Sequence, residues 1–127
     1  MGYGRIDNFA SKEKITPDSF ATYTAPTTIK TNQFAYKGDW NVMSEYANPQ
    51  KGASLIFNFE SKQVFLVMRT KGTPAKVKVY IDDELDSVIT VDADKLYELI
   101  NLSVAGRHTL RLEFEDSNAE LFAFTFG

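Results

Sequence analysis

The sequence predicts an all-β domain, either a sandwich or a barrel. Apolar and polar residues alternate in many short segments, the pattern of strands with one buried and one solvent-facing side. Turn residues separate these segments at intervals of about 8 to 12 residues, a spacing typical of sandwiches and barrels. The chain also contains 10 Phe, 6 Tyr and 1 Trp, and aromatic side chains pack well on pleated sheets. No segment predicts a long helix, and no internal repeat is visible.

The composition excludes several classes of protein. The length of 127 residues fits one domain, large enough to bury roughly two-thirds of its unfolded surface. The net charge is −3, and no Lys/Arg stripe is interleaved with aromatics, so we expect no nucleic-acid partner. The chain has no cysteine, which removes disulfides, thiolate nucleophiles and thiolate metal ligands. No apolar run approaches the roughly 20 residues of a membrane span, so we expect no membrane insertion.

Residues 1–26 are polar and irregular, and we expect them to form a linker or a strap laid over a sandwich at residues 27–127. Gly, Pro and short polar residues interrupt every period in this stretch. Five apolar side chains are candidates to pin the strap to the sheet: Tyr3, Ile6, Phe9, Phe20 and Tyr23. The stretch has no apolar core of the signal-peptide kind. Its beginning looks cut from a longer chain, so any export signal is expected further upstream.

Short strands are then predicted in order along the chain. The first four are expected at residues 28–31, 33–37, 40–46 and 55–59, with a Gly38-Asp39 turn and a loop at residues 48–52. Residues 64–68 are apolar at every position, which predicts a central strand covered on both faces.

The second half of the chain continues the pattern. Residues 76–81 and 87–91 are predicted to pair across an acidic turn at residues 82–84. Residues 95–102 fit both a helical and an extended period, and their neighbours favour a strand. Gly106 is expected to open a final hairpin, in which Leu110, Leu112 and Phe114 share one face and Phe122, Phe124 and Phe126 alternate after a turn at residues 116–118.

Few residues carry reactive chemistry. His108 is the only histidine, so a nucleophilic triad would need it as the general base. It lies in phase with Leu110 and Leu112, which favours a structural, half-buried imidazole bonded to a loop. Asp82, Asp83, Glu84 and Asp86 lack the loop spacing of an EF-hand and favour a solvated hairpin tip. We therefore predict no catalytic residue, no metal site and no cofactor, and a hydrolase is the least favoured hypothesis.

Aromatic side chains give the one candidate binding site. A sugar site needs flat rings for the apolar face of a pyranose, and Tyr36, Trp40 and Tyr80 are the candidates. Tyr80 shares the polar face of its strand with Lys76 and Lys78, and Trp40 follows a turn. The alternative is that Trp40 anchors the core, as a lone Trp in a small sandwich more often does, and that Tyr80 is an ordinary surface residue.

An ordered set of short motifs resembles the C-terminal domain of DipZ-type thioredoxin-like proteins, which belong to the cytochrome c biogenesis and thiol-disulfide class. The motifs are Gly-Tyr-Gly-Arg-x-x-Asn-Phe at residues 2–9, Tyr-Thr-Ala-Pro at 23–26, Gly-Asp-Trp at 38–40, Phe-Leu-Val at 65–67, Leu-Tyr at 96–97, Gly-Arg-His-Thr-Leu at 106–110 and Leu-Phe-Ala-Phe-Thr-Phe-Gly at 121–127. The set extends across most of the chain.

The resemblance implies a jelly-roll β-sandwich similar to galactose-binding domains and carbohydrate-binding modules. It also implies an extracytoplasmic location and a thioredoxin-like domain upstream that carries the Cys-x-x-Cys redox site. The expected function is that of a non-catalytic accessory domain that docks or targets the redox domain. The alternative is a genuine carbohydrate-binding module for a cell-wall or surface glycan. At the 82–83 turn the chain has Asp-Asp where Asp-Gly suits a type I′ turn better.

Overall fold

The computed structural model describes residues 1–5 and 8–127, and its regular structure is almost all β. One short 3₁₀ turn, η1, covers Tyr3–Arg5. The strands are β1 (Phe20–Tyr23), β2 (Phe34–Val42), β3 (Ala47–Pro49), β4 (Ser54–Thr70), β5 (Ala75–Ile81), β6 (Glu84–Val91), β7 (Lys95–Phe114) and β8 (Ala119–Phe126). In the described part of the chain, no helix is long and apolar enough to cross a membrane.

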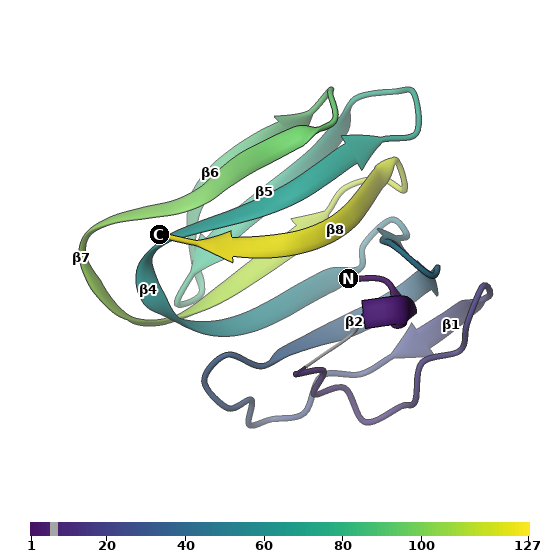
Figure 1. The fold of residues 1–127 in the computed structure, drawn as a ribbon, viewed down its shortest axis with the longest axis horizontal. Helices are drawn as coiled ribbons and strands as arrows, with labels where there is room; N and C mark the ends of the chain where they lie inside the picture. Colours follow the sequence, from purple (N-terminus) through teal and green to yellow (C-terminus); the bar gives the residue numbers. More distant parts are fainter. Residues whose placement is uncertain (6–7) are drawn as a thin grey trace.

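The strands form one antiparallel sheet that folds back on itself into a jelly-roll β-sandwich. Their order is β1-β2-β3-β8-β4-β7-β5-β6, with β2 also paired to β4. The first half of β4 pairs with β2 and the second half with β8, so the strand passes from one layer to the other. Figure 1 shows this bend at the left, where β4 and β7 both curve, with β8 (yellow) on the near side. The predicted sandwich class and jelly-roll architecture are confirmed.

Bulges explain how two such long strands bend. The β4–β7 register shifts between Ser61 and Gln63 and again between Val64 and Phe65, and a bulge increases the local twist of a strand. Gly106 lies opposite Ser61, at the bend and inside β7. The prediction that Gly106 opens a hairpin is therefore wrong, because β7 runs without a break. Residues 95–102 are its first half, which settles the helix-or-strand ambiguity as strand.

The core lies between the two layers and consists of the inward side chains of nearly every strand. Aromatic rings form a continuous column inside it: the Tyr36 and Trp40 ring centroids are 4.1 Å apart and stacked, and Trp40 meets Phe114 edge-on at 5.6 Å. Such offset and edge-on pairs stabilise beyond the area they bury. Leu66 and Leu112 are among the fully buried aliphatic residues that fill the rest.

The strap packs closely on the sandwich over the residues described. Tyr23 is buried and Phe9 packs against the core, whereas Phe20 is 66% exposed and pins nothing. Phe20 and Tyr23 bound β1, which pairs with β2, so part of residues 1–26 is a sheet strand. Ile6 lies outside the described residues. The boundary at residue 26 stays a prediction.

One local prediction is confirmed, the turn after residue 81, and another is partly wrong. The 82–83 turn keeps positive φ at both central residues, 49° at Asp82 and 68° at Asp83, which is the type I′ signature, despite the missing glycine. At residues 64–68, the inward side chains Val64, Leu66 and Met68 are buried. Phe65 and Val67, which point outward, are only half-buried, so the outer face of this central strand is not covered as expected.

Candidate functional site

Strand register brings outward side chains into rows on the layer formed by β2, the first half of β4, the second half of β7, and β5. Direct cross-strand partners share a face of the sheet. The rows that result are Lys37–Ser54–Glu113–Lys78, Ala35–Ile56–Arg111–Tyr80, and Asn58–Thr109.

A groove crosses these rows, walled by the loop that follows β1 and by the β5–β6 turn. Its volume is about 650 Å³, and its lining is Ala25, Pro26, Thr27, Ile29, Lys37, Ser54, Ile56, Asn58, Asp83, Thr109 and Arg111. Asn58 donates a hydrogen bond to the Ile29 carbonyl oxygen, which ties the loop wall to the floor, and Thr109 donates to Asn58 at 2.9 Å. Apart from Ile56, the floor is therefore polar and held by hydrogen bonds, and the lining contains no aromatic side chain.

Arg111 is one of the residues that line the groove, and its guanidinium lies between two carboxylates. Its Nη1 donates to Glu113, and its Nε lies 3.8 Å from the Asp83 carboxylate. Nε is buried and has no hydrogen-bond partner, so one strong donor beside the groove is left unsatisfied. The arrangement presents donors and acceptors side by side, which suits a ligand rich in hydroxyl groups.

The three predicted sugar-binding rings do not meet in this groove. Tyr36 and Trp40 are 0% exposed because their strand positions point into the core. Tyr36 donates from its hydroxyl to the Met1 carbonyl oxygen at 2.7 Å, burial raises its pKa, and Trp40 donates to the Lys37 carbonyl oxygen at 3.1 Å. The hypothesis that these two rings lie at the surface for a sugar to stack on is wrong, because both are buried. The alternative that Trp40 anchors the core is confirmed.

Tyr80 lies in the expected outward row, but its ring is covered. The guanidinium carbon of Arg111 lies 4.1 Å from the ring centroid, so a cation–π contact occupies one face. The ring thus holds Arg111 in place. A direct contact between Tyr80 and a ligand remains a prediction.

His108 links β7 to the β5–β6 turn through Asp82. Its Nδ1 donates to Asp82 at 2.5 Å, and the same carboxylate accepts the backbone N–H of Thr109 at 2.9 Å. These bonds, the one from His108 first, hold the pKa of Asp82 below its ordinary value. They clamp the β5–β6 turn, and with it the Asp83 wall of the groove, onto β7.

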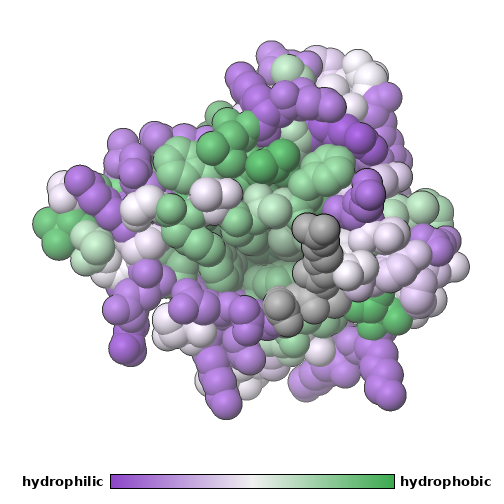
Figure 2. All heavy atoms as spheres, viewed as in Figure 1, coloured by the Kyte–Doolittle hydropathy of each residue, from purple (hydrophilic) through white to green (hydrophobic). Residues whose placement is uncertain are grey.

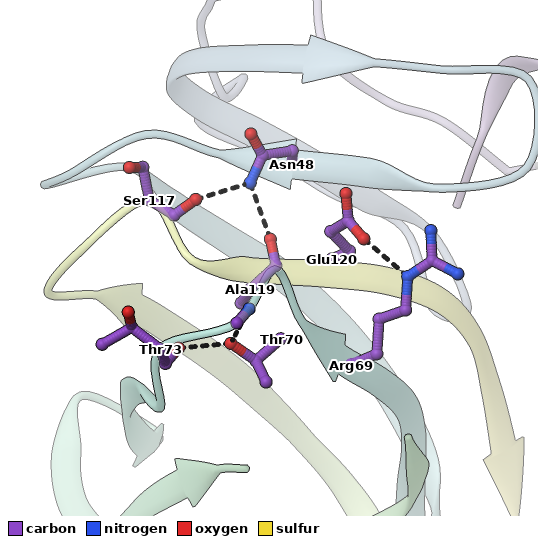
Figure 3. Close-up of polar contacts among 8 residues, drawn as sticks. Asn48, Arg69, Thr70, Thr73, Ser117, Ala119 and Glu120 are labelled. Atoms are coloured by element: carbon purple, nitrogen blue, oxygen red, sulfur yellow. Dashed lines mark hydrogen bonds and ion pairs between the residues drawn. The ribbon is translucent and has the colours of Figure 1, made fainter. Parts of the chain in front are cut away.

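Over residues 1–5 and 8–127, no three His, Cys, Asp or Glu side chains lie close enough to hold a metal ion. A polar cluster joins β3, β4 and β8, as Figure 3 shows. Asn48, 1% exposed, donates to the carbonyl oxygens of Ser117 at 2.9 Å and Ala119 at 2.7 Å. Arg69 pairs with the buried Glu120 at 2.6 Å. These bonds tie β3 and β4 to β8, so the cluster stabilises the sheet.

The groove residues were not predicted from the sequence. Arg111, Asn58 and Thr109 appear there as ordinary polar positions of alternating strands. The signal that unites them is the pairing of β4 with β7, since Asn58 and Thr109 are 51 positions apart and nothing local fixes that register.

Comparison with known proteins gives one family and several structures of similar fold. The family of thioredoxin-like C-terminal domains matches residues 1–127. No curated protein matches the sequence. A salicylyl-acyltransferase, SsfX3, from a tetracycline biosynthetic pathway shares 17% identity at a TM-score of 0.62, covering 87% of this chain and 40% of its own.

Two family two carbohydrate esterases are also similar. The enzyme from Cellvibrio japonicus has 18% identity and a TM-score of 0.59, over 64% of this chain and 26% of the esterase. The enzyme from Clostridium thermocellum, in complex with cellohexaose, has 18% identity and a TM-score of 0.57, over 65% and 27%. This chain thus corresponds to less than half of each of these proteins, and at such identities the likeness is one of fold.

Proposed function

Because the chain belongs to the family of thioredoxin-like C-terminal domains, we propose that it is a non-catalytic accessory domain of an exported, DipZ-type thioredoxin-like thiol–disulfide oxidoreductase. The observation that carries the proposal is the family match over residues 1–127 in a chain that contains no cysteine. Thiol–disulfide exchange proceeds through a thiolate, so a neighbouring domain must supply it. The accessory role is to dock on, orient or target that domain.

Disulfide-exchange kinetics on the full-length protein test this role. We expect residues 1–127 alone to reduce no disulfide, and the full-length protein to reduce a small model disulfide equally well with and without them. Reduction of a protein substrate, or retention at the cell surface, should fall when they are removed. Exchange activity in residues 1–127 alone, or a full-length protein without a thioredoxin-like domain, would overturn the proposal.

The location outside the cytoplasm is part of the same proposal. It follows from the resemblance to DipZ-type proteins, which implies a place outside the cytoplasm, where the disulfides on which such a domain could act form and persist. Fractionation of cells that make the full-length protein tests it, with a periplasmic or surface fraction expected and a cytoplasmic fraction contradicting it.

A second candidate function is glycan binding, which the groove favours. The volume of about 650 Å³ falls in the range of small-ligand sites. The Arg111 guanidinium there contacts two carboxylates, Glu113 through Nη1 and Asp83 at 3.8 Å from Nε. The structure of a family two carbohydrate esterase of similar fold is in complex with cellohexaose.

Titration calorimetry with cell-wall oligosaccharides separates this candidate from the first. We expect binding heat that is lost in Arg111→Ala and kept in Val104→Ala, a matched control at a position 75% exposed outside the groove. Absence of heat with every glycan would remove the candidate, and equal binding by Arg111→Ala would remove this site.

A further inference from the structure

The second layer of the sandwich contains β8, the second half of β4 and the first half of β7. Its outer face carries apolar side chains in register. Val67 on β4 pairs with Leu96 on β7 and with Ala123 on β8, so these three side chains form a row across the sheet. Phe65 lies two residues away on the same side. Phe122 adjoins the row at the point where the β4–β8 register shifts. We call these five residues the β8 face.

The β8 face is open to solvent. Leu96 is 48% exposed, Ala123 is exposed, and Phe65, Val67 and Phe122 are half-buried. Figure 2 shows apolar side chains around a hollow in the middle of one face of the molecule, with hydrophilic residues toward the rim. A contiguous apolar patch of this kind marks an interaction surface, and the uninterrupted apolar run at residues 64–68 is what a strand covered on both faces requires.

The start of the chain is held against the same face. A second groove, of about 640 Å³, is lined by Met1, Gly2, Gly4, Ser44, Glu45, Phe122 and Ala123, so Phe122 and Ala123 belong to both. The Met1 backbone nitrogen donates to the Phe122 carbonyl oxygen. Figure 1 shows the N-terminus beside β8.

Several bonds fix the direction of the chain at this point. The Tyr3 N–H donates to Met43 O and the Gly4 N–H to Ser44 O, each at 2.8 Å. Gly2 is packed so tightly that a Cβ there would lie 2.4 Å from the backbone carbon of Glu45. The first residues are therefore held on the sandwich and do not form a free linker. A domain joined ahead of Met1 would begin next to the β8 face.

We infer that the β8 face is the surface on which the thioredoxin-like domain packs in the full-length protein, through an apolar patch of its own. The inference rests on the proposed function, which supplies that domain, and adds where and how it docks. The first residues lie beside this face. Joining two domains in one chain raises their effective concentration, so a modest apolar contact can hold them together.

The groove around Arg111 lies on the other layer of the sandwich. Docking on the β8 face therefore leaves the groove open. An accessory domain arranged in this way can hold the redox domain on one side and meet a ligand on the other.

Nuclear magnetic relaxation of the full-length protein tests the inference. Packed domains tumble together with one rotational correlation time, whereas tethered but separate domains show two shorter ones. The variant Leu96→Glu places a charge in the middle of the β8 face. Val104→Glu is the matched control, because Val104 is also on β7 and is 75% exposed but outside the face. Ala123→Glu is a second test variant, at an exposed position on β8.

We expect one correlation time for the wild type and for Val104→Glu, and two for Leu96→Glu and Ala123→Glu, with unchanged amide spectra of the core. Independent tumbling of the wild-type domains, or coupled tumbling in both test variants, would overturn the inference while leaving the accessory role intact. Self-association of the full-length protein that is lost in Leu96→Glu would assign the face to a second copy and also overturn it. Absence of a thioredoxin-like domain would overturn the proposed function itself.

Discussion

The substitution Asn48→Asp is predicted to destabilise the sandwich strongly, although it changes one side-chain group for another of the same shape. The Asn48 amide nitrogen donates to two carbonyl oxygens of the β7–β8 connection and β8, at 2.9 and 2.7 Å, and the residue is 1% exposed. A carboxylate puts an anionic acceptor in place of that donor. In Figure 3 the carbonyl oxygens of Ser117 and Ala119 both point toward the Asn48 amide nitrogen.

The magnitude follows from the number of bonds lost. A buried polar group left without its partner costs about 1–3 kcal/mol. Leaving both carbonyl groups unpaired should therefore lower the free energy of unfolding by about 2–6 kcal/mol. A domain of this kind has a free energy of unfolding of about 5–15 kcal/mol, and the variant should therefore lose a large share of it at pH 7.

The loss should depend on pH, with a defined sign. Burial against two carbonyls raises the pKa of the new carboxyl in the folded state above its unfolded value of about 3.9. The protonated form, which can donate one bond, is then favoured by folding, so the cost is smallest below about pH 4. It should grow by about 1.4 kcal/mol for each pH unit above that until the folded pKa is reached.

Urea denaturation of the wild type, Asn48→Asp and Asn101→Asp at pH 4 and pH 7 measures the effect. Asn101 is exposed on β7 and controls for added charge. A cost below about 1 kcal/mol at pH 7, where two lost bonds predict more, would refute the reasoning. A cost equal at the two pH values would refute the linkage argument.

Three further predictions follow from the packing and the clamp. Gly2→Ala should lower the free energy of unfolding by about 1–3 kcal/mol through overpacking, because its Cβ would meet the Glu45 backbone at 2.4 Å. An unchanged melting temperature would contradict the close packing of the first residues on the sandwich. His108→Ala should raise the pKa of Asp82, which carboxyl ¹³C titration measures. In the wild type the lowered pKa of Asp82 adds to the free energy of unfolding above about pH 4, and this contribution is lost as pH falls through that pKa, so the variant should show a smaller contribution. An unchanged titration would show that His108 is not the main partner of Asp82. Leu66→Ala, at a side chain 0% exposed, should cost about 2–5 kcal/mol in urea denaturation, and a cost near zero would mean that the site collapses around the cavity.

The fold class could be predicted because it depends on local pattern. Leu110, Leu112 and Phe114 are all buried on one face of β7, as their alternation requires. Where the alternation failed, a bulge was responsible. Phe122, Phe124 and Phe126 were expected on one face, but the register shift between Val67 and Met68 leaves Phe122 unpaired, and it packs with Tyr46 instead.

The candidate site could not be predicted, because it depends on which strands pair. Trp40 and Tyr80 are both aromatic residues in alternating strands, and only the structure shows that Trp40 points inward while Tyr80 lies under Arg111. The β8 face was visible in part, since the run at residues 64–68 is apolar throughout. Its partners Leu96 and Ala123 lie on strands whose register the sequence does not fix.

Covalent footprinting of the full-length protein tests the docking claim most directly. The protein is labelled with a short-lived carbene before and after proteolytic separation of the thioredoxin-like domain from residues 1–127. If the β8 face holds the thioredoxin-like domain, labelling at Leu96 and Ala123 rises on separation. Labelling at Lys37 and Asp83, which line the open groove, stays the same. Equal labelling of Leu96 and Ala123 in the joined and the separated protein would contradict the docking claim.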